Sequence, residues 1–449
     1  MTSGNPATTT RLKQTPAMAA GVLLAAIGIF AVMAGQARAV EVQRVVSPTG
    51  IEAWLVEEDT VPLIAMSFAF VGGASQDPAD RPGVANMLSG LIDEGAGDLD
   101  SKAFQGALDD YSIELSFDAG RDGFFGSLKT LVENRDEAVR LLKLALSEPR
   151  FDTEPVERIR AQIVAGITRE ERDPDGAAGE ALIAAAFPEH PYGRPVEGTV
   201  ETVAAITVDD LKTFFGKNVA RDNLKIAVVG AIDARALAVL LDEVFGALPV
   251  KANLDLVRDV VPSTGQRIDI AMNIPQTVIS FLGKGLLRND PDFIPGVIAA
   301  RILGGGTFSS RLYDEIREKR GLAYSVGLGL SAYDHAGLVV GGTRTRADQA
   351  DNVITLIEQE IERFAADGAT EKELADAKSY MIGSYALRFT TSTRIARQLL
   401  AIQLDGLGLD YIDRRNDLID AVTIDDIKRV SRRLFTDDMI VVRVGQPAS

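Results

Sequence analysis

The chain has 449 residues, of which 46% are hydrophobic and 25% are charged, a composition typical of globular proteins that excludes a disordered chain. Its formal net charge of −17 argues against a nucleic-acid partner, since an acidic surface repels phosphate backbones. The same acidity favours basic peptides as ligands, although it would also serve simply to keep the protein soluble. There is no cysteine, which excludes disulfide bonds and thiolate chemistry, and there are only two histidines.

Residues 1–39 have the features of a signal peptide. Arg11 and Lys13 precede the uncharged run AMAAGVLLAAIGIFAVMAG, and the following ARA has small residues where a signal peptidase cleaves. We expect cleavage after Ala39 and a periplasmic or secreted protein. This segment has three basic residues and no acidic one, so the mature charge would be −17 − 3 = −20. The run is 19 residues long, and an uncleaved membrane anchor is the alternative; contact with a membrane is expected only in that case.

Periodicity and turn residues predict the elements of the first half. Alternating large and small residues predict four strands, the last two forming a hairpin, at 51–58, 63–71, 112–120 and 122–131. Helical patterns are present at 83–95, 133–147 and 153–172. The helix at 83–95 follows a Pro-Gly turn, and Thr207 with Asp210 forms a capping pair for a later helix.

The second half repeats the first. A shift of 213 places residues 67–84 on 280–297 without a gap, with eight identities in eighteen positions. AAITVDDLKTFF at 204–215 likewise resembles DAVTIDDIKRVS at 420–431, and each precedes a short apolar strand. Repeats at this spacing indicate duplicated domains. We therefore predict an α+β fold of two homologous domains, each an antiparallel-rich sheet packed with helices, with the boundaries 40–249, 250–267 (linker) and 268–449.

In the second half, SSRLYDEIREKR predicts an amphipathic helix. Leu312, Tyr313 and Ile316 would face inward, and Gly321 would end the helix before the strand LAYSVGLGL. Without further information, Arg317 would be a solvated charge on this helix and Tyr324 a half-buried strand residue.

Two stretches, GGGTFSSRLYDEIREKRGLAYSV (304–326) and GATEKELADAKSYMIGSYALRF (368–389), resemble the pitrilysin/insulinase-like zinc peptidases, also called inverzincins. FPEHPYGRPVEGTVETVAAITVDDLKTFF (187–215) is a weaker match, and the resemblance covers roughly 41–447. It implies a processing-peptidase-like duplication. The chain is similar to the metal-free subunit of two-subunit bacterial members and of mitochondrial processing peptidase.

Active members of this family carry the zinc motif H-x-x-E-H, and the matching positions of this sequence contain no metal-binding residue. In active members the two histidines on one helical face bind zinc and the glutamate acts as the base. Here the motif falls on Asn86, Met87, Leu88, Ser89 and Gly90, and the third ligand on Ile163 or Val164. We therefore expect no cofactor in this chain and zinc on a partner subunit.

Other catalytic sites find little support. His190 and His335 lie in separate loops without a second histidine at metal-ligand spacing, so they are expected to be surface or capping residues. The sequence contains no G-x-S-x-G motif, and LGGGTFSS lacks the lysine of a phosphate-binding loop.

The resemblance also gives Arg317 and Tyr324 a role. Zinc members carry an Arg and a Tyr at this spacing, which bind substrate carbonyls and the developing oxyanion. Gly304, Gly305 and Gly306 precede them, either as a flexible loop that approaches an extended peptide or as a tight turn.

These residues imply a non-zinc-binding subunit of an exported heterodimeric metallopeptidase. It would be inactive alone and would supply Arg317 and Tyr324 to a homologous H-x-x-E-H partner that cleaves peptides. The alternatives are a structural scaffold and a peptide-binding chamber without a protease partner.

Overall fold

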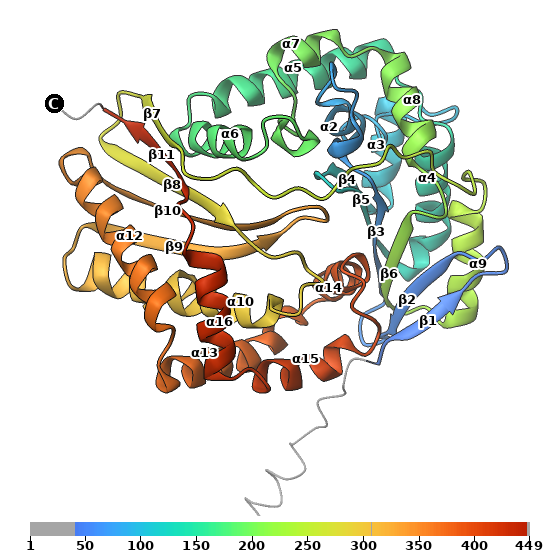
Figure 1. Ribbon diagram of the computed structural model, residues 1–449. Helices are drawn as coiled ribbons and strands as arrows, with labels where there is room; N and C mark the ends of the chain where they lie inside the picture. The colour runs from blue at the N-terminus through green and yellow to red at the C-terminus, as the bar shows by residue number, and fades with distance from the viewer. Residues whose placement is uncertain (1–40, 307, 447–449) are drawn as a thin grey trace, which may run out of the picture. The chain divides into compact units, whose positions relative to one another are not determined.

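The computed structural model describes residues 41–306 and 308–446, and the chain from Val42 onward forms one compact unit (Figure 1). The predicted signal peptide at 1–39 lies outside the described residues. Among the helices described, none combines the length and the apolar character needed to cross a bilayer. The predicted domain boundaries at 250 and 267 stay a prediction.

The first half contains a six-stranded sheet in the order β1-β2-β6-β3-β5-β4. Its strands are β1 Gln43–Val46, β2 Glu52–Glu57, β3 Leu63–Val71, β4 Glu114–Ala119, β5 Gly123–Leu131 and β6 Leu224–Gly230. Its helices are α2 Val84–Ser89, α3 Ser101–Asp110, α4 Arg135–Ser147, α5 Thr153–Glu170, α6 Pro174–Ala186, α7 Val200–Ala205, α8 Val208–Asn218 and α9 Ala234–Phe245. β2 and β6 are parallel and the other pairs are antiparallel.

The second half contains a five-stranded sheet in the order β7-β11-β8-β10-β9. Its strands are β7 Arg267–Ala271, β8 Gln276–Lys284, β9 Ala323–Ala332, β10 Gly337–Arg346 and β11 Ile440–Gly445. Its α-helices are α10 Phe293–Ala300, α11 Arg311–Tyr313, α12 Ala350–Asp367, α13 Glu371–Gly383, α14 Ser392–Leu404, α15 Tyr411–Asp420 and α16 Ile424–Phe435. Two π-helical segments, η4 Arg301–Gly305 and η5 Asp314–Glu318, flank α11.

The two sheets share one topology, which confirms the predicted fold class. The order β2-β6-β3-β5-β4 corresponds to β7-β11-β8-β10-β9, and in both series only the first pair is parallel. β3 at 63–71, shifted by 213, falls on 276–284, the bounds of β8. The later helices α8 and α16 begin with the same Thr-Asp capping box, at Thr207 and Thr423.

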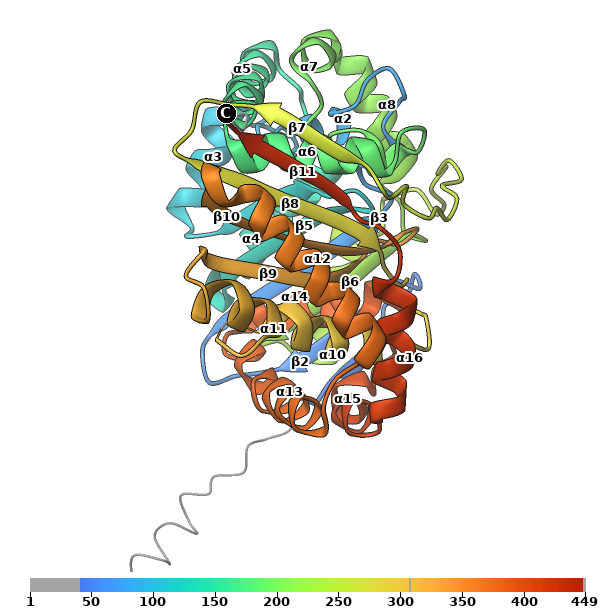
Figure 2. The same cartoon turned by 60° about the vertical axis from the view of Figure 1, so that its left-hand side comes forward.

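Each half lends one helix to the sheet of the other half. α6, from the first half, packs on β8 and β11, while α14, from the second half, packs on β3 and β6. Figure 2 shows α12 crossing the second sheet on the face opposite α6. Gln403 of α14 donates a hydrogen bond of 2.8 Å to the carbonyl of Ile226 in β6. We predicted that each sheet would pack with helices of its own half. The structure differs, because α6 and α14 each pack on the sheet of the other half.

A cluster of polar residues also connects the halves. The buried Tyr192 hydroxyl donates to Asp122 Oδ1 at 2.5 Å and accepts from the backbone N–H of His335 at 3.0 Å. The second oxygen of Asp122 accepts from the backbone N–H of Asp334 at 3.1 Å. The tips of the β4–β5 and β9–β10 hairpins are thus joined through one phenol, and we refer to Asp122, Tyr192, Asp334 and His335 as the hairpin clamp.

Two local predictions need correction. The helix expected over 83–95 ends at Ser89, because Gly90 caps it and the backbone then turns. The helix expected at 309–320 is a short α-helical turn followed by the π-helical η5, although Leu312, Tyr313 and Ile316 are buried as predicted. Gly321 follows with a φ of 62°, the left-handed conformation that favours glycine at a helix C-terminus.

Candidate functional site

The positions of the zinc motif lie on α2, at the wall of a cavity, and do not offer metal ligands. Ser89 is buried, and its hydroxyl donates to the carbonyl of Asn86 at 2.8 Å. A side chain at Gly90 would have its Cβ 3.2 Å from Ile159 Cγ2, so aliphatic groups of α5 approach the place of the second histidine. Met87 and Leu88 are fully buried in the core.

The position of the third ligand is equally unsuited to zinc. Ile163 and Val164 pack against the hydrophobic core of the first half. Zinc in proteins is bound by imidazole, thiolate and carboxylate groups. None of these groups is present at the motif positions Asn86, Ser89 and Gly90 or at Ile163 and Val164. Over residues 41–306 and 308–446 no group of three or more His, Cys, Asp or Glu side chains is arranged to hold a metal ion. The residues present therefore do not fit the zinc ion that active members of the resembled family bind.

An acidic cavity of about 740 Å³ lies beside α2. Asn86 and Ile163 line it, together with the carboxylates of Glu170, Glu171, Asp175, Glu180 and Glu197. Arg121 and Arg169 are its basic lining residues. Asp175 is paired with Arg344, and the other four carboxylates against two guanidinium groups make this cavity suited to cationic ligands. Sequence reasoning missed these carboxylates individually; the acidic run around the end of α5 was the available signal.

A buried carboxylate positions the N-terminus of α2. Asp77 accepts hydrogen bonds from the N–H groups of Gly83 at 2.8 Å and Ala85 at 2.9 Å, and Gly83 has a φ of 101°. Burial raises the pKa of Asp77 to about 7, although those N–H groups oppose the change. In the second half the equivalent Asp290 instead pairs with Arg433 at 2.6 Å. The repeated Asp-Pro and Pro-Gly residues thus build the entry to the first helix in both halves.

The structure brings Arg317 and Tyr324 together. The Arg317 guanidinium carbon lies 4.8 Å from the ring centre of Tyr324, 4.9 Å from that of Tyr313 and 5.4 Å from that of Phe308. Its nearest carboxylate is that of Glu318, with a separation of 4.0 Å between Nε and Oε1. Stacking on three rings holds the guanidinium in place while its N–H groups stay available for a ligand.

Tyr324 is one of the most exposed aromatic residues of the chain, with 82% of its surface accessible. The half-buried position expected from a strand pattern is therefore wrong. It lies near the start of β9, the edge strand of the second sheet, and its hydroxyl makes no hydrogen bond to a described residue. Tyr324 lines a cavity of about 520 Å³, and Asp175, which lines this cavity too, also borders the acidic cavity. The acidic cavity beside α2 and the cavity at Tyr324 are therefore neighbours.

The glycine segment is more ordered than a loop. Gly304 and Gly305 end η4, and Gly306 follows with an extended backbone. A Cβ at Gly304 would lie 2.5 Å from the Cβ of Leu328, so this position requires glycine for close packing against β9. None of the three glycines has a positive φ. Their role in binding a peptide stays a prediction.

The two histidines support the contact between the halves. His190 Nδ1 accepts from the backbone N–H of Tyr192 at 3.2 Å, which caps the short 3₁₀ turn Pro191–Gly193. His335 Nδ1 lies 2.9 Å from Asp259 Oδ1 in the segment that connects the halves. Burial lowers the pKa of His190 and favours the neutral ring. These contacts assign both residues a structural environment.

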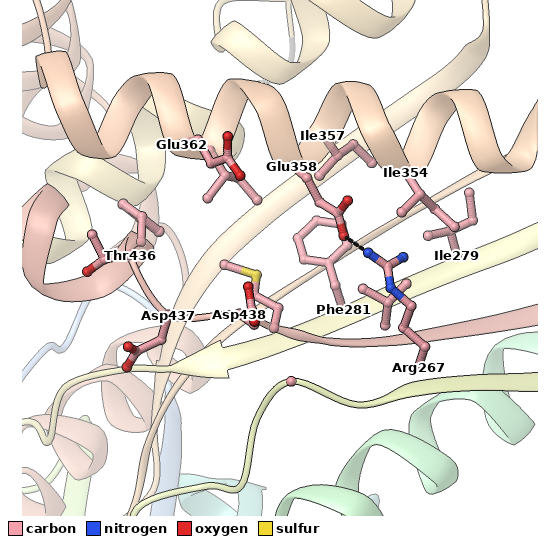
Figure 3. Close-up of a pocket in the computed structure, with 15 residues that line it drawn as sticks. Arg267, Ile279, Phe281, Ile354, Ile357, Glu358, Glu362, Thr436, Asp437 and Asp438 are labelled. Carbon is pink, nitrogen blue, oxygen red and sulfur yellow. Dashed lines mark hydrogen bonds and ion pairs between the residues drawn. The ribbon is translucent and has the colours of Figure 1, made fainter.

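A further cavity, of about 220 Å³, lies between β8, α12 and residues 436–439 (Figure 3). Figure 3 shows Arg267 and Glu358 meeting in it, at a distance of 2.6 Å. None of the predicted site residues lines this cavity, so it plays no part in the candidate site.

Comparisons with known proteins agree with the geometry. Residues 205–381 match the family model described as the peptidase M16 inactive domain. The chain is 27% identical over 337 residues to a protein of Helicobacter pylori named non-peptidase homolog YmxG, covering 75% of this chain and 78% of that protein. It is 26% identical over 424 residues to a protein of Mycobacterium leprae named uncharacterized zinc protease, covering 92% and 94%. The crystal structure of a peptidase M16 inactive domain from Pseudomonas fluorescens superposes with a TM-score of 0.85 at 27% identity, covering 91% of this chain and 99% of that one.

Proposed function

Because this chain belongs to the M16 peptidase family and carries the family's inactive domain, we propose that it is the non-zinc-binding subunit of a heterodimeric metallopeptidase. It would be exported, with a mature N-terminus near Val40. The partner would be a homologous chain with an intact H-x-x-E-H motif, and the substrates would be peptides. The family and the resemblance to its metal-free members are the premise; the partner and the role in proteolysis are the proposal.

The observation that carries the proposal is the Arg317–Tyr324 pair. The guanidinium is held by three rings without a close carboxylate, and the phenol is exposed at a sheet edge. A charged donor and a neutral donor side by side suit a peptide carbonyl that acquires negative charge during hydrolysis. The motif helix of the same chain offers no zinc ligand, so the reacting metal would come from the partner.

The acidic cavity supports a peptide as the ligand. Asp175 lines both this cavity and the Tyr324 cavity, so a peptide bound at the Arg317–Tyr324 pair has the other four carboxylates within the adjoining cavity. Cationic side chains are the natural complement of such a surface. Basic peptides are therefore the substrates to test first.

The test is to co-express the chain with a candidate H-x-x-E-H partner, verify the heterodimer by size, and measure cleavage of an unstructured basic peptide. Tyr324→Phe should lower turnover by about 100- to 1,000-fold, the usual effect of losing one oxyanion donor, and Arg317→Ala by at least as much. Matched controls are Tyr111→Phe and Arg346→Ala, both at exposed positions outside the two cavities. Full activity of both site variants in an intact complex would contradict the proposal.

A second candidate function is peptide binding without a protease partner. The name of the Helicobacter pylori relative, non-peptidase homolog, favours it. It predicts that the chain alone retains basic peptides in an equilibrium binding assay and that no zinc-dependent subunit co-purifies with the native protein.

A further inference from the structure

Another cavity, of about 520 Å³ and distinct from the Tyr324 cavity, lies among the helices of the second half. Four arginines line it, and we refer to it as the arginine cavity. Arg288 and Arg301 come from the region of α10, Arg388 from the turn after α13, and Arg415 from α15. Gly305 of the glycine segment lines it, but neither Arg317 nor Tyr324 does, so this cavity adjoins the candidate site without containing the Arg317–Tyr324 pair.

The charge of this cavity is opposite to that of the molecule. The chain carries a net charge of −17, yet only one carboxylate, that of Asp405, lines the cavity. It is already paired with Arg288 at 2.9 Å. In the described part of the chain, Arg301, Arg388 and Arg415 form no ion pair. Three unpaired guanidinium groups around one cavity of an acidic protein lack a negatively charged partner.

Aromatic rings hold these guanidinium groups in position. The Arg301 guanidinium carbon lies 3.5 Å from the ring centre of Tyr380, and that of Arg415 lies 3.9 Å from the ring centre of Tyr385. Stacking occupies the faces of a guanidinium and leaves its edges for hydrogen bonds. Nη1 of Arg301 donates to the Gly305 carbonyl at 3.4 Å and Nη1 of Arg415 to the Met381 carbonyl at 3.3 Å, and their other N–H groups stay available for carboxylate or phosphate oxygens. The donors are therefore fixed before a ligand arrives, which reduces the ordering cost of binding.

A buried phenol without a partner gives a second, independent indication. The side chain of Tyr385 is only 7% exposed and lines the cavity, and its hydroxyl makes no hydrogen bond within the described residues. Burial raises the pKa of Tyr385, so the hydroxyl stays protonated and able to donate. An unsatisfied buried donor is unfavourable, and an acidic oxygen of a ligand would satisfy it.

The remaining lining is apolar and places a second requirement on the ligand. Apolar side chains from six segments contribute to it, among them Ile294, Leu328, Leu330, Met381, Ile402 and Ile419. A free inorganic anion would leave this surface in contact with water, whereas an apolar chain would cover it.

We infer that this cavity binds an amphiphilic organic anion, with a carboxylate or phosphate group on Arg301, Arg388, Arg415 and Tyr385 and an apolar body against the aliphatic wall. The comparison with the first half supports this assignment. The acidic cavity beside α2 is built from corresponding elements, α2, α5 and α6 in place of α10, α13 and α14. The two cavities have linings of opposite charge, so they suit ligands of opposite charge.

The test measures binding to the full chain by titration calorimetry at low salt with four probes. These are octyl phosphate, octanoate, inorganic phosphate and octyltrimethylammonium. We expect octyl phosphate or octanoate to bind at least about 10-fold more tightly than inorganic phosphate. The cationic probe has the acidic cavity beside α2 as its own site, and we expect it not to displace the bound alkyl anion. The stronger of the two alkyl anions identifies the acidic group. Displacement of the bound alkyl anion by the cationic probe, or no binding of either alkyl anion, would overturn the inference.

Variants locate the site. Arg415→Gln should weaken binding of the alkyl anion by about 10- to 100-fold, the usual effect of losing a charge-assisted hydrogen bond. Arg388 is exposed, so Arg388→Gln serves as a second variant that leaves the fold intact. Arg397→Gln is the matched control, because Arg397 lies on α14 but lines a different cavity. Unchanged affinity in both site variants, or an equal loss in the control, would show that the anion binds elsewhere and refute the assignment.

Discussion

The hairpin clamp permits a quantitative prediction. Tyr192→Phe removes one hydroxyl and keeps the buried ring, so the change isolates two hydrogen bonds between the halves. The bond to the Asp122 carboxylate is charge-assisted and contributes roughly 1.5–3 kcal/mol, and the bond from the His335 N–H about 1 kcal/mol. We therefore expect the free energy of unfolding to fall by roughly 2–4 kcal/mol.

The assay is urea unfolding followed by circular dichroism at pH 8. The midpoint should fall while the slope of free energy against urea stays unchanged, because the variant changes a contact and not the surface exposed on unfolding. The double-mutant cycle with Asp122→Asn should give a coupling energy of about 1–3 kcal/mol. Tyr111→Phe is the control, since Tyr111 is 44% exposed and its hydroxyl bonds to no described residue. A loss equal to that of the control, or a coupling energy near zero, would refute this account of the clamp.

Three further predictions concern other contacts. Leu182→Ala in α6 should lower the free energy of unfolding by about 2–5 kcal/mol, because Leu182 is buried against the second sheet; an equal loss in the exposed control Val239→Ala would contradict this. Burial and the nearby Asp122 raise the pKa of Asp334 from 3.8 to about 6, so its contribution to stability is present at low pH and is lost as the pH rises through 6. Asp334→Asn should consequently stabilise by about 1 kcal/mol at pH 8, after allowance for solvent screening, and hardly at all at pH 4; urea midpoints at both pH values test this, and a gain independent of pH argues against it. Arg311→Ala should cost about 3 kcal/mol, because Glu373 loses its ion-pair partner, while the buried Glu360 keeps Arg363 at 2.8 Å. Burial would raise the pKa of Glu373, but hydrogen bonds from Arg311 and Thr370 lower it to about 2, so the wild type loses this stabilisation as the pH falls from about 4.5 to 2 and the variant should lack that part of the acid dependence.

Local patterns predicted the elements that their own residues determine. β3 and the β4–β5 hairpin lie where alternation placed them, and the capping box at Thr207 forms as expected. The internal repeat indicated the shared topology of the two sheets. These features depend on contacts close in sequence or on a repeat that a comparison of the chain with itself detects.

Contacts between distant segments were not predictable in the same way. The pairing of Arg317 with Tyr324 came from a resemblance, but the ring stack with Phe308 and the exposure of Tyr324 required the fold. The arginine cavity gathers residues between 288 and 415, and no local pattern relates them. The exchange of α6 and α14 was missed because an amphipathic helix does not specify which sheet it will cover.

That exchange has a consequence for synthesis on the ribosome. β6, the last strand of the first sheet, ends at residue 230, but α14, which packs on β3 and β6 of that sheet, ends at residue 404, so the completing helix emerges 404 − 230 = 174 residues later. At about 5–20 residues per second this is a delay of roughly 10–35 s, during which the nascent first half exposes a sheet face that nothing in its own sequence covers. A chain interrupted anywhere before residue 392 would therefore have a defective first half as well as an incomplete second one, and the newly made protein needs protection from aggregation until almost its entire length has been translated.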